Sequence, residues 1–404
     1  MTVWNPATDR GSGLVGCLAC LLLAAAPISA AELTGRASLL GTAGWAGSGD
    51  LGATASGSER LTGDQQALRL MLDEAGEHGE WSLHVNTRRL HLDGMPLPMQ
   101  VPVDRFRYRS LAHDWIDDQG ADSVTRAGYA VDRAFYRHRF DQLTVGIGRQ
   151  PIDWGTGRFW QPMNVFGAFA PTDLDTDFKP GIDALVADWY PSPLSSLTVA
   201  WVLSPQHDPA EDSAAAYFRR QVGMQSELAL LAGRVRGENV TGAALQGEVR
   251  GMGWRVEGVR HGIGQGEDGG LSWIAGVDYQ LRDGTLLTAE WRDHGGTTIP
   301  SEPLTADTMR PEDRRVLGLG ASRDLTPLLQ GGYTLLVSPL RGADGSREFS
   351  WLHQLNLTWS MSNESDLLLS LLHADGRGLD ATGHPRSAFG HLPTTVTLRY
   401  RHYF

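Results

Sequence analysis

The sequence predicts an all-β fold, a transmembrane antiparallel up-and-down β-barrel, from three observations. Segments in which apolar and polar side chains alternate recur from about residue 34 to the last residue. The connections between these segments alternate between short turns and longer loops. The chain also begins with a signal for export from the cytoplasm.

Residues 1–31 have the features of a cleaved signal peptide. A short polar start precedes an apolar run from Leu14 to Ile28, and small residues follow it. This run is shorter than the roughly 20 residues that a membrane-spanning helix needs. Both cysteines, Cys17 and Cys20, lie in this part. We therefore expect residues 32–404 to form a single barrel domain without thiols or disulfides.

The composition after residue 31 is polar and acidic. The net charge is −12, and the basic residues are arginines apart from Lys179. A nucleic-acid partner is not expected, because no concentrated basic face is present. No later stretch resembles a transmembrane helix, but barrel strands with one lipid-facing and one lumen-facing side do not look hydrophobic in a running average.

Residues 349–359 illustrate the alternation, which recurs at 81–88, 197–204 and 271–281. One face carries Phe349, Trp351, Leu355, Leu357 and Trp359, and the other carries Ser350, Gln354, Asn356 and Thr358. Elsewhere the polar face carries charged pairs such as Arg255 with Glu257 and Glu290 with Arg292. A soluble β-protein with water-facing polar sides is the alternative. Tryptophans near strand ends on the apolar face favour a membrane.

The turns fix the number of strands. Short turns fall near 75–79, 140–142, 191–195, 225–226, 251–253, 282–284, 324–327 and 362–365, and longer connections near 47–63, 92–125, 153–181, 205–214, 264–270, 294–313, 341–346 and 375–393. Only the connection at 237–239 is a short outer one. Strict alternation gives about 18 strands, with 16 as the alternative. The strand-like segment from Val103 to Trp115 is then expected within an outer loop, as a local hairpin.

The last predicted strand, 395–404, runs to the final residue of the chain. Leu398, Tyr400 and Phe404 share its apolar face, and Arg399, Arg401 and Tyr403 share the other. A chain end usually frays. A full strand there is what closure of a barrel onto its first strand requires.

With its signal peptide, alternating strands and terminal Phe404, the chain resembles the Gram-negative outer-membrane porins. The resemblance implies a place in the bacterial outer membrane among lipid and lipopolysaccharide, and it leaves homo-oligomerisation open. It also implies that the barrel-assembly machinery recognises the last strand through Phe404, Tyr400 and Leu398, although His402 departs from the usual apolar residue. The architecture is similar to the 18-stranded classes, both the substrate-selective porins and the alginate exporter.

The longest break in the alternation is the stretch 148–183, GRQPIDWGTGRFWQPMNVFGAFAPTDLDTDFKPGID. It is similar to a segment of little-characterised porin-like barrels. Turn parity places it at the outer end. We expect the loop at about 153–181 to fold into the lumen, the alternative being an external loop that never enters it.

Charged residues suggest a constriction around this loop. The preceding strand would direct its arginines into the lumen, because an arginine facing lipid costs about 2 to 4 kcal/mol. The next strand offers Gly146 and Gly148 on its lumen face for packing against the loop. Opposed charges at a narrow point select solutes by charge. The candidate constriction residues are Arg133, Arg137, Arg139, Arg158, Asp173, Asp175, Asp177 and Lys179.

No cofactor, metal or enzyme activity is expected. The alternating aspartates from Asp173 begin like a calcium loop, but Phe178 stands where glycine is required and Ala184 where a glutamate belongs. No serine motif of the G-x-S-x-G kind is present, so a barrel enzyme is less favoured. The sequence predicts diffusion of small polar or anionic solutes. The alternative is an export conduit for a polysaccharide or another substrate, working with an inner-membrane system.

Overall fold

The computed structural model describes residues 31–50, 59–94, 103–120, 123–205, 208–262, 270–294, 315–339, 349–380 and 383–404. Residues 1–30 of the predicted signal peptide lie outside the described residues. Within the described part of the chain, no helix is long and apolar enough to cross a membrane.

Strands make up almost all of the regular structure. Their bounds are β1 Glu32–Trp45, β2 Arg60–Ala75, β3 Gly79–Asp93, β4 Ala112–Gln119, β5 Ser123–Arg139, β6 Leu143–Gln150, β7 Ile182–Ser192, β8 Ser195–Val202, β9 Ser213–Val222, β10 Ser226–Val235, β11 Glu238–Val249, β12 Met252–His261, β13 Leu271–Gln280, β14 Leu286–Asp293, β15 Val316–Thr326, β16 Leu329–Ser338, β17 Ser350–Ser360, β18 Ser365–Asp375 and β19 Thr394–Tyr403.

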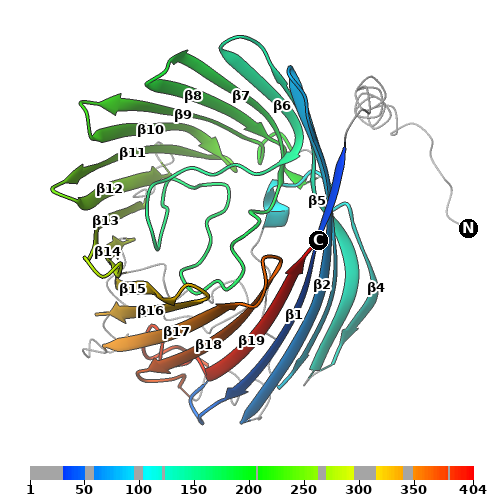
Figure 1. Ribbon diagram of the computed structural model, residues 1–404, viewed down its shortest axis with the longest axis vertical. Coiled ribbons are helices and arrows are strands. Elements are labelled where there is room, and N and C mark those ends of the chain that lie inside the picture. The colour runs from blue at the N-terminus through cyan, green and yellow to red at the C-terminus, as the bar shows by residue number, and fades with distance from the viewer. Residues whose placement is uncertain are drawn as a thin grey trace, which may run out of the picture.

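Antiparallel pairing of neighbours closes these strands into one barrel (Figure 1). The seam is formed by β19 and β1, with Tyr403 opposite Arg36 and Thr394 opposite Trp45. The closed barrel has 18 strands, so the prediction of 18 is confirmed and the alternative of 16 is wrong. Closure gives each of the 18 barrel strands two hydrogen-bonded neighbours, which a membrane requires.

The nineteenth strand, β4, lies beside the barrel wall. It forms a hairpin with β5, pairing Ala112 with Ala130 and Gln119 with Val124, and has no other strand partner among the described residues. It thereby covers the part of β5 that lies beyond the shorter β6, which pairs only from Ala134 to Arg139. A short 3₁₀ helix, η1 Val103–Phe106, precedes it.

The ends of the strands fall where the turn pattern placed them. Only residues 76–78 separate β2 from β3, and only 250–251 separate β11 from β12. Residues 94–122 and 151–181, by contrast, connect β3 to β5 and β6 to β7 at the opposite end. Turn chemistry was therefore sufficient to place the strands in order and direction.

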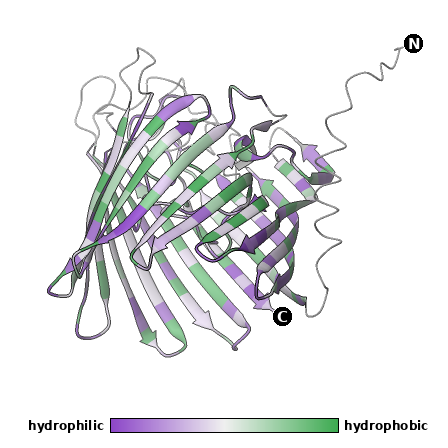
Figure 2. Cartoon of the chain, turned by 90° about the horizontal axis from the view of Figure 1, so that it is seen from above, coloured by the Kyte–Doolittle hydropathy of each residue, from purple (hydrophilic) through white to green (hydrophobic). Residues whose placement is uncertain are grey.

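Hydrophilic and hydrophobic residues alternate along the strands of the wall (Figure 2). In β17, Leu355 is 42% exposed on the outside, whereas the adjacent Gln354 is 3% exposed on the inside. Trp351 and Trp359, near the two ends of the same strand, are also exposed on its outer face. An exposed apolar outer face is what a lipid-embedded barrel needs.

The inner face differs from a uniformly polar lumen wall. On β7 to β12 and on β13 to β17 it carries buried apolar side chains such as Val202, Leu231, Ile274 and Leu336. These pack in two clusters against aromatic residues of the loops. The hydrophobic core therefore lies inside the barrel, between the wall and the loop segments that enter it.

Candidate functional site

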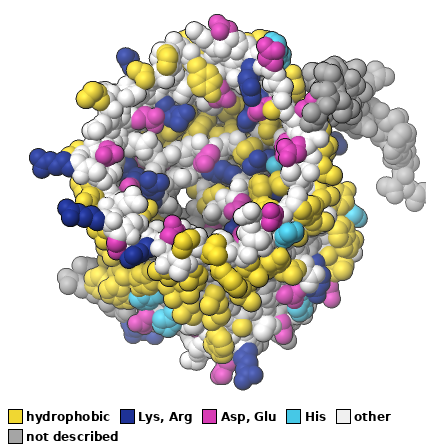
Figure 3. All heavy atoms as spheres, in the orientation of Figure 1, with side chains coloured by type: hydrophobic (Ala, Val, Ile, Leu, Met, Phe, Trp, Pro, Cys, Tyr) yellow, Lys and Arg dark blue, Asp and Glu magenta, His cyan; other side chains and the backbone are white. Residues whose placement is uncertain are grey.

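The segment between β6 and β7, residues 151–181, runs through the interior of the barrel (Figure 1). We call it the inner loop. Its first part contacts β12 and β14, and its later part contacts β17, β19 and β1. In Figure 3, charged side chains lie around the hollow of the barrel and also project from its rim, and apolar side chains form a broad band on its outer surface.

Two glutamates of the wall hold the first part of the inner loop by its backbone. Glu257 of β12 accepts bonds from the Thr156 amide at 2.5 Å, the Thr156 hydroxyl at 2.9 Å and the Met163 amide at 2.7 Å. Its side chain is fully buried. A buried carboxylate is stable only when hydrogen bonds replace its water. The donors of the inner loop supply that replacement.

Glu290 of β14 binds the backbone between Thr156 and Met163 in the same way. It accepts the backbone amides of Arg158 at 2.9 Å, Phe159 at 3.1 Å and Trp160 at 2.9 Å. Three consecutive amides can converge on one carboxylate only if the backbone turns tightly. Gly155 has a φ of +103°, and a Cβ on Gly157 would collide with the Trp160 carbonyl. Backbone conformation at Gly155 and steric crowding at Gly157 therefore explain why both positions of the Gly-Thr-Gly turn are glycine.

Apolar side chains fix the same part of the inner loop. Trp154 stacks on Tyr217 of β9 with ring centroids 5.1 Å apart and contacts Phe166 edge-on. Trp160 and Met163 are almost fully buried against the wall. Large buried side chains contribute roughly 1.5 to 3 kcal/mol each. The part from Trp154 to Phe166 is thus anchored by both packing and hydrogen bonds.

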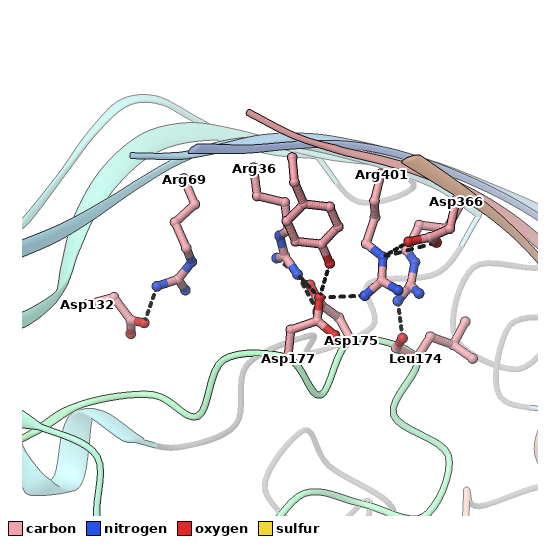
Figure 4. Close-up of polar contacts among 10 residues, drawn as sticks. Arg36, Arg69, Asp132, Leu174, Asp175, Asp177, Asp366 and Arg401 are labelled. Atoms are coloured by element: carbon pink, nitrogen blue, oxygen red, sulfur yellow. Dashed lines mark hydrogen bonds and ion pairs between the residues drawn. The ribbon is translucent and has the colours of Figure 1, made fainter. Parts of the chain in front are cut away.

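The later part of the inner loop presents carboxylates to arginines of the wall (Figure 4). Arg36 of β1 binds Asp175 with both terminal nitrogens at 2.7 Å and Asp177 at 2.8 Å. Arg401 and Tyr403 of β19 each donate to the same Asp177 oxygen at 2.5 Å. One carboxylate oxygen thereby receives three donors from both sides of the seam.

Titration of two groups in this part follows from their surroundings. Burial alone would raise the pKa of the Asp177 carboxyl, but the Tyr403 hydrogen bond and the charges of Arg401 and Arg36 outweigh it and hold that pKa below its usual value. Burial lowers the pKa of the Lys179 ammonium, even though the ammonium bonds to the Asp153 carboxylate.

Phe178, next to Asp177, lies among cations. The guanidinium carbons of Arg69 and Arg36 are 4.4 Å and 4.9 Å from the centre of its ring, and that of Arg133 is 5.9 Å away. The ring of His84 approaches its edge at a centroid distance of 6.1 Å. A guanidinium over an aromatic face is attracted by the ring quadrupole.

The candidate arginines of β5 have different surroundings. Arg137 and Arg139 both pair with Glu80 of β3, at 3.2 Å and 3.1 Å. Arg133 forms no ion pair among the described residues and reaches the Lys179 carbonyl at 3.5 Å. A bulge in β5 between the partners of His84 and Val85 lies next to it.

The remaining candidates lie at separate points of the lumen. Arg158, whose side chain is 58% exposed, is 3.6 Å from Asp278 of β13. Asp173 accepts the Ala170 amide at 2.8 Å within the inner loop. Among the described residues, no group of three or more His, Cys, Asp or Glu could hold a metal ion.

Gly146 and Gly148 have their nearest neighbours in the wall. A Cβ on Gly146 would meet Gln150 and Arg137, and one on Gly148 would meet the backbone of β5 at Ala134 and Phe135. Gly148 also has a φ of +117°. These contacts concern the pairing of β6 with β5, and packing of the glycines against the inner loop stays a prediction.

The structure gives Arg255 and two glutamates of the wall partners that the sequence did not indicate. Arg255 pairs with Asp278 of the next strand, while Glu257 and Glu290 bind the inner loop. The sequence did indicate that these polar side chains face the lumen. In β19, for example, Arg399 and Arg401 alternate with apolar residues. Their partners lie up to 226 positions away in the chain, so local spacing could not identify them.

Alternate residues of the C-terminal strand face outward at the seam. Leu398 and Phe404 are exposed on the outer face of the wall. Phe404 exchanges two backbone hydrogen bonds with Gly35, at 2.7 Å and 3.0 Å. The last residue is therefore fully paired, as the predicted closure of the barrel requires.

No protein-family model matches the sequence, and a search of the curated proteins found no match. Solved structures do resemble it. Acinetobacter baumannii OccAB2 has a TM-score of 0.57 at 11% identity, covering 93% of this chain and 98% of that one. Pseudomonas aeruginosa OccK9 (OpdG) has a TM-score of 0.57 at 11% identity, and the match covers 93% of this chain and 97% of that one. The outer membrane protein OpdK of P. aeruginosa has a TM-score of 0.54 at 11% identity, and the match covers 92% of this chain and 99% of that one. The chain thus has the closed 18-stranded barrel fold of the outer-membrane porins to which these structures belong.

Proposed function

We propose that this protein is a channel of the bacterial outer membrane through which small polar or anionic solutes diffuse, and that the inner loop sets its narrowest part. The observation that carries the preference for anions is a pair of arginines without an ion-pair partner. Arg133 and Arg399 lie on the inner face of the wall and form no ion pair among the described residues. Cations lining a pore raise the local concentration of anions.

The other candidate residues contribute to the same field. Arg158 is exposed in the lumen near Asp278, and Asp173, Asp175, Asp177 and Lys179 belong to the same inner loop. Arg137 and Arg139 are partly neutralised by Glu80, so we assign them a smaller effect than Arg133. Outer-membrane lipid and lipopolysaccharide would surround the exposed apolar face, and Phe404, Tyr400 and Leu398 would guide assembly.

Conductance of the purified protein in planar bilayers tests the proposal. We expect discrete channels whose reversal potential in a salt gradient favours anions. The change Arg133→Gln should shift that potential toward cations, because it removes an unpaired lumen charge. Arg234→Gln is the control, since Arg234 lies on the outer face of β10 with Leu230. Absence of any channel would refute the proposal, and equal shifts in both variants would refute the role of Arg133.

Deletion of residues 158–178 tests the inner loop separately. We expect the single-channel current to rise by about a factor of two or more, because less of the lumen is filled. The heat-resistant folded form on a gel serves as the control that the barrel still closes. A folded deletion variant with unchanged current would show that the constriction lies elsewhere.

A further inference from the structure

The outer face of β17 and β18 carries two histidines side by side. His353 lies directly opposite His373 in the pairing of these strands, and the two rings are 25° from parallel with centroids 6.3 Å apart. Leu355 and Leu371, two positions away on the same strands, are 42% and 41% exposed on the outside of the wall. Alternate positions of a strand share a face, so both imidazoles also lie on the outside.

The pair lies at the end of the barrel that bears the long connections. β17 begins at Ser350, just before His353, and β18 ends at Asp375, just after His373. In outer-membrane barrels the long connections face the outside of the cell, and aromatic side chains mark the edges of the hydrocarbon layer. Trp351, 39% exposed on the same face, lies between His353 and that end. The two histidines are thus at the level of the headgroups of the outer leaflet.

A hydroxyl group holds one ring nitrogen of each histidine. The Tyr333 hydroxyl of β16 is 2.7 Å from Nδ1 of His353, and the Thr394 hydroxyl of β19 is 2.8 Å from Nδ1 of His373. Among the described residues, neither Nε2 has a hydrogen-bond partner. A hydroxyl that donates to Nδ1 leaves the imidazole proton on Nε2, and a protonated ring donates from Nε2 as well. Two N–H donors thus lie side by side at the membrane surface.

Phosphate is the headgroup chemistry that fits two such donors, because its charged oxygens accept hydrogen bonds more strongly than neutral groups do. We propose that His353 and His373 bind a phosphate of a lipid A headgroup in the outer leaflet. The acyl chains of that lipid would then lie on the exposed leucines of the same two strands. Binding of this kind does not require conduction, so it can be tested apart from the channel.

One neighbouring charge distinguishes a phosphate site from a metal site. Asp375 lies on the same face as His373, two positions further toward the outside, and is exposed. Its carboxylate repels a phosphate, whereas it would join the two imidazoles as a ligand of a divalent metal ion. Within the part of the chain that the structure describes, no group of three or more His, Cys, Asp or Glu could hold a metal ion. The arrangement therefore favours phosphate.

Native mass spectrometry of the full barrel in detergent, titrated with lipid A, tests the site. The double variant His353→Phe/His373→Phe keeps two aromatic rings but removes both N–H donors. Its Kd for lipid A should be about tenfold weaker than that of the unchanged protein, because bonds to a charged group are lost. Fully dephosphorylated lipid A is the matched ligand, and the unchanged protein should bind it about tenfold more weakly than lipid A.

The matched control is the double variant His138→Phe/His402→Phe. These histidines lie at the opposite end of the barrel, where their rings contact the exposed Phe140 and Phe404. The control should bind lipid A within about twofold of the unchanged protein. Equal Kd values in the two double variants would overturn the site, and equal Kd values for the two ligands would overturn its specificity for phosphate. Heat-resistant migration on an unheated gel verifies folding, and His373→Phe alone replaces the double variant if that chain does not fold.

Two single variants separate phosphate from a metal ion. His373→Arg still donates to a phosphate but cannot bind a metal ion, so it should retain the affinity for lipid A. Asp375→Asn removes the repelling charge and should tighten binding. Loss of binding in His373→Arg, or weaker binding in Asp375→Asn, would overturn the phosphate assignment. A protein that conducts without this preference for lipid A loses only the site, and one that binds lipid A without conducting loses only the proposed channel function.

Discussion

At the residue scale, Glu257 and Glu290 use the same chemistry on one stretch of the inner loop, residues 156–163. Each places one buried carboxylate among three donors from the loop. Hydrogen bonds to a charged group contribute about 1.5 to 3 kcal/mol, more than bonds between neutral groups. The change Glu290→Gln keeps the shape but removes the charge and one acceptor oxygen.

We expect Glu290→Gln to loosen the turn at residues 158–160 without opening the barrel. A loss of about 2 kcal/mol accelerates amide exchange of these residues roughly 30-fold. Hydrogen exchange followed by mass spectrometry would measure it. Glu227→Gln is the matched control, because Glu227 lies on the wall and accepts from the Gln246 side chain at 3.1 Å. Equal protection in both variants would contradict the anchoring role.

At the element scale, the seam depends on contact between β1 and the end of β19. A Cβ on Gly35 would overlap the Phe404 ring, although the Gly35 backbone is not left-handed. Gly41 lies in the same strand, and a Cβ there would meet no atom within 4 Å. Gly35 and Gly41 thus differ in the space available for a side chain.

We expect Gly35→Ala to destabilise closure by about 1 to 3 kcal/mol, as overpacking does, and Gly41→Ala to be tolerated. The measurement is the fraction of heat-resistant folded protein on an unheated gel, followed over a temperature series. If both variants behaved like the unchanged protein, packing of Phe404 on Gly35 would not contribute to the seam.

At the scale of the whole molecule, the barrel separates lipid from lumen across a single layer of strands. Leu355 faces outward in the middle of β17, and Asn356 faces inward opposite Gly332, where an added Cβ would meet nothing within 4 Å. Adjacent residues of a strand therefore have different surroundings, because one side chain faces lipid and the next faces the lumen.

We expect Leu355→Arg to lower the free energy of unfolding by about 2 to 4 kcal/mol, because its charge would face the hydrocarbon. Asn356→Arg places the same group toward the lumen and should cost less than about 1 kcal/mol. Denaturant unfolding in lipid vesicles compares the two. Equal costs would contradict the assignment of the two faces.

The fold followed from local rules, so it could be predicted. Period-two alternation determined the faces of β17 and β19, and turn residues determined the order and direction of the 18 strands. Both patterns depend only on a few neighbouring residues and not on residues far away in the chain. The strand β4 was expected only as a local hairpin, because its pairing with the outer part of β5 depends on how short β6 is.

The sequence by itself determined a barrel with a charged, glycine-punctuated loop between two strands, and its aspartates and arginines could be named as candidates. Only the tertiary structure decided which groups meet. Asp177 bonds to Arg36 and Arg401 across the seam, and Glu290 holds amides 130 positions away or more. The physical reason is that an ion pair depends on distance in space, and closure of the barrel brings together residues whose separation along the chain carries no such information.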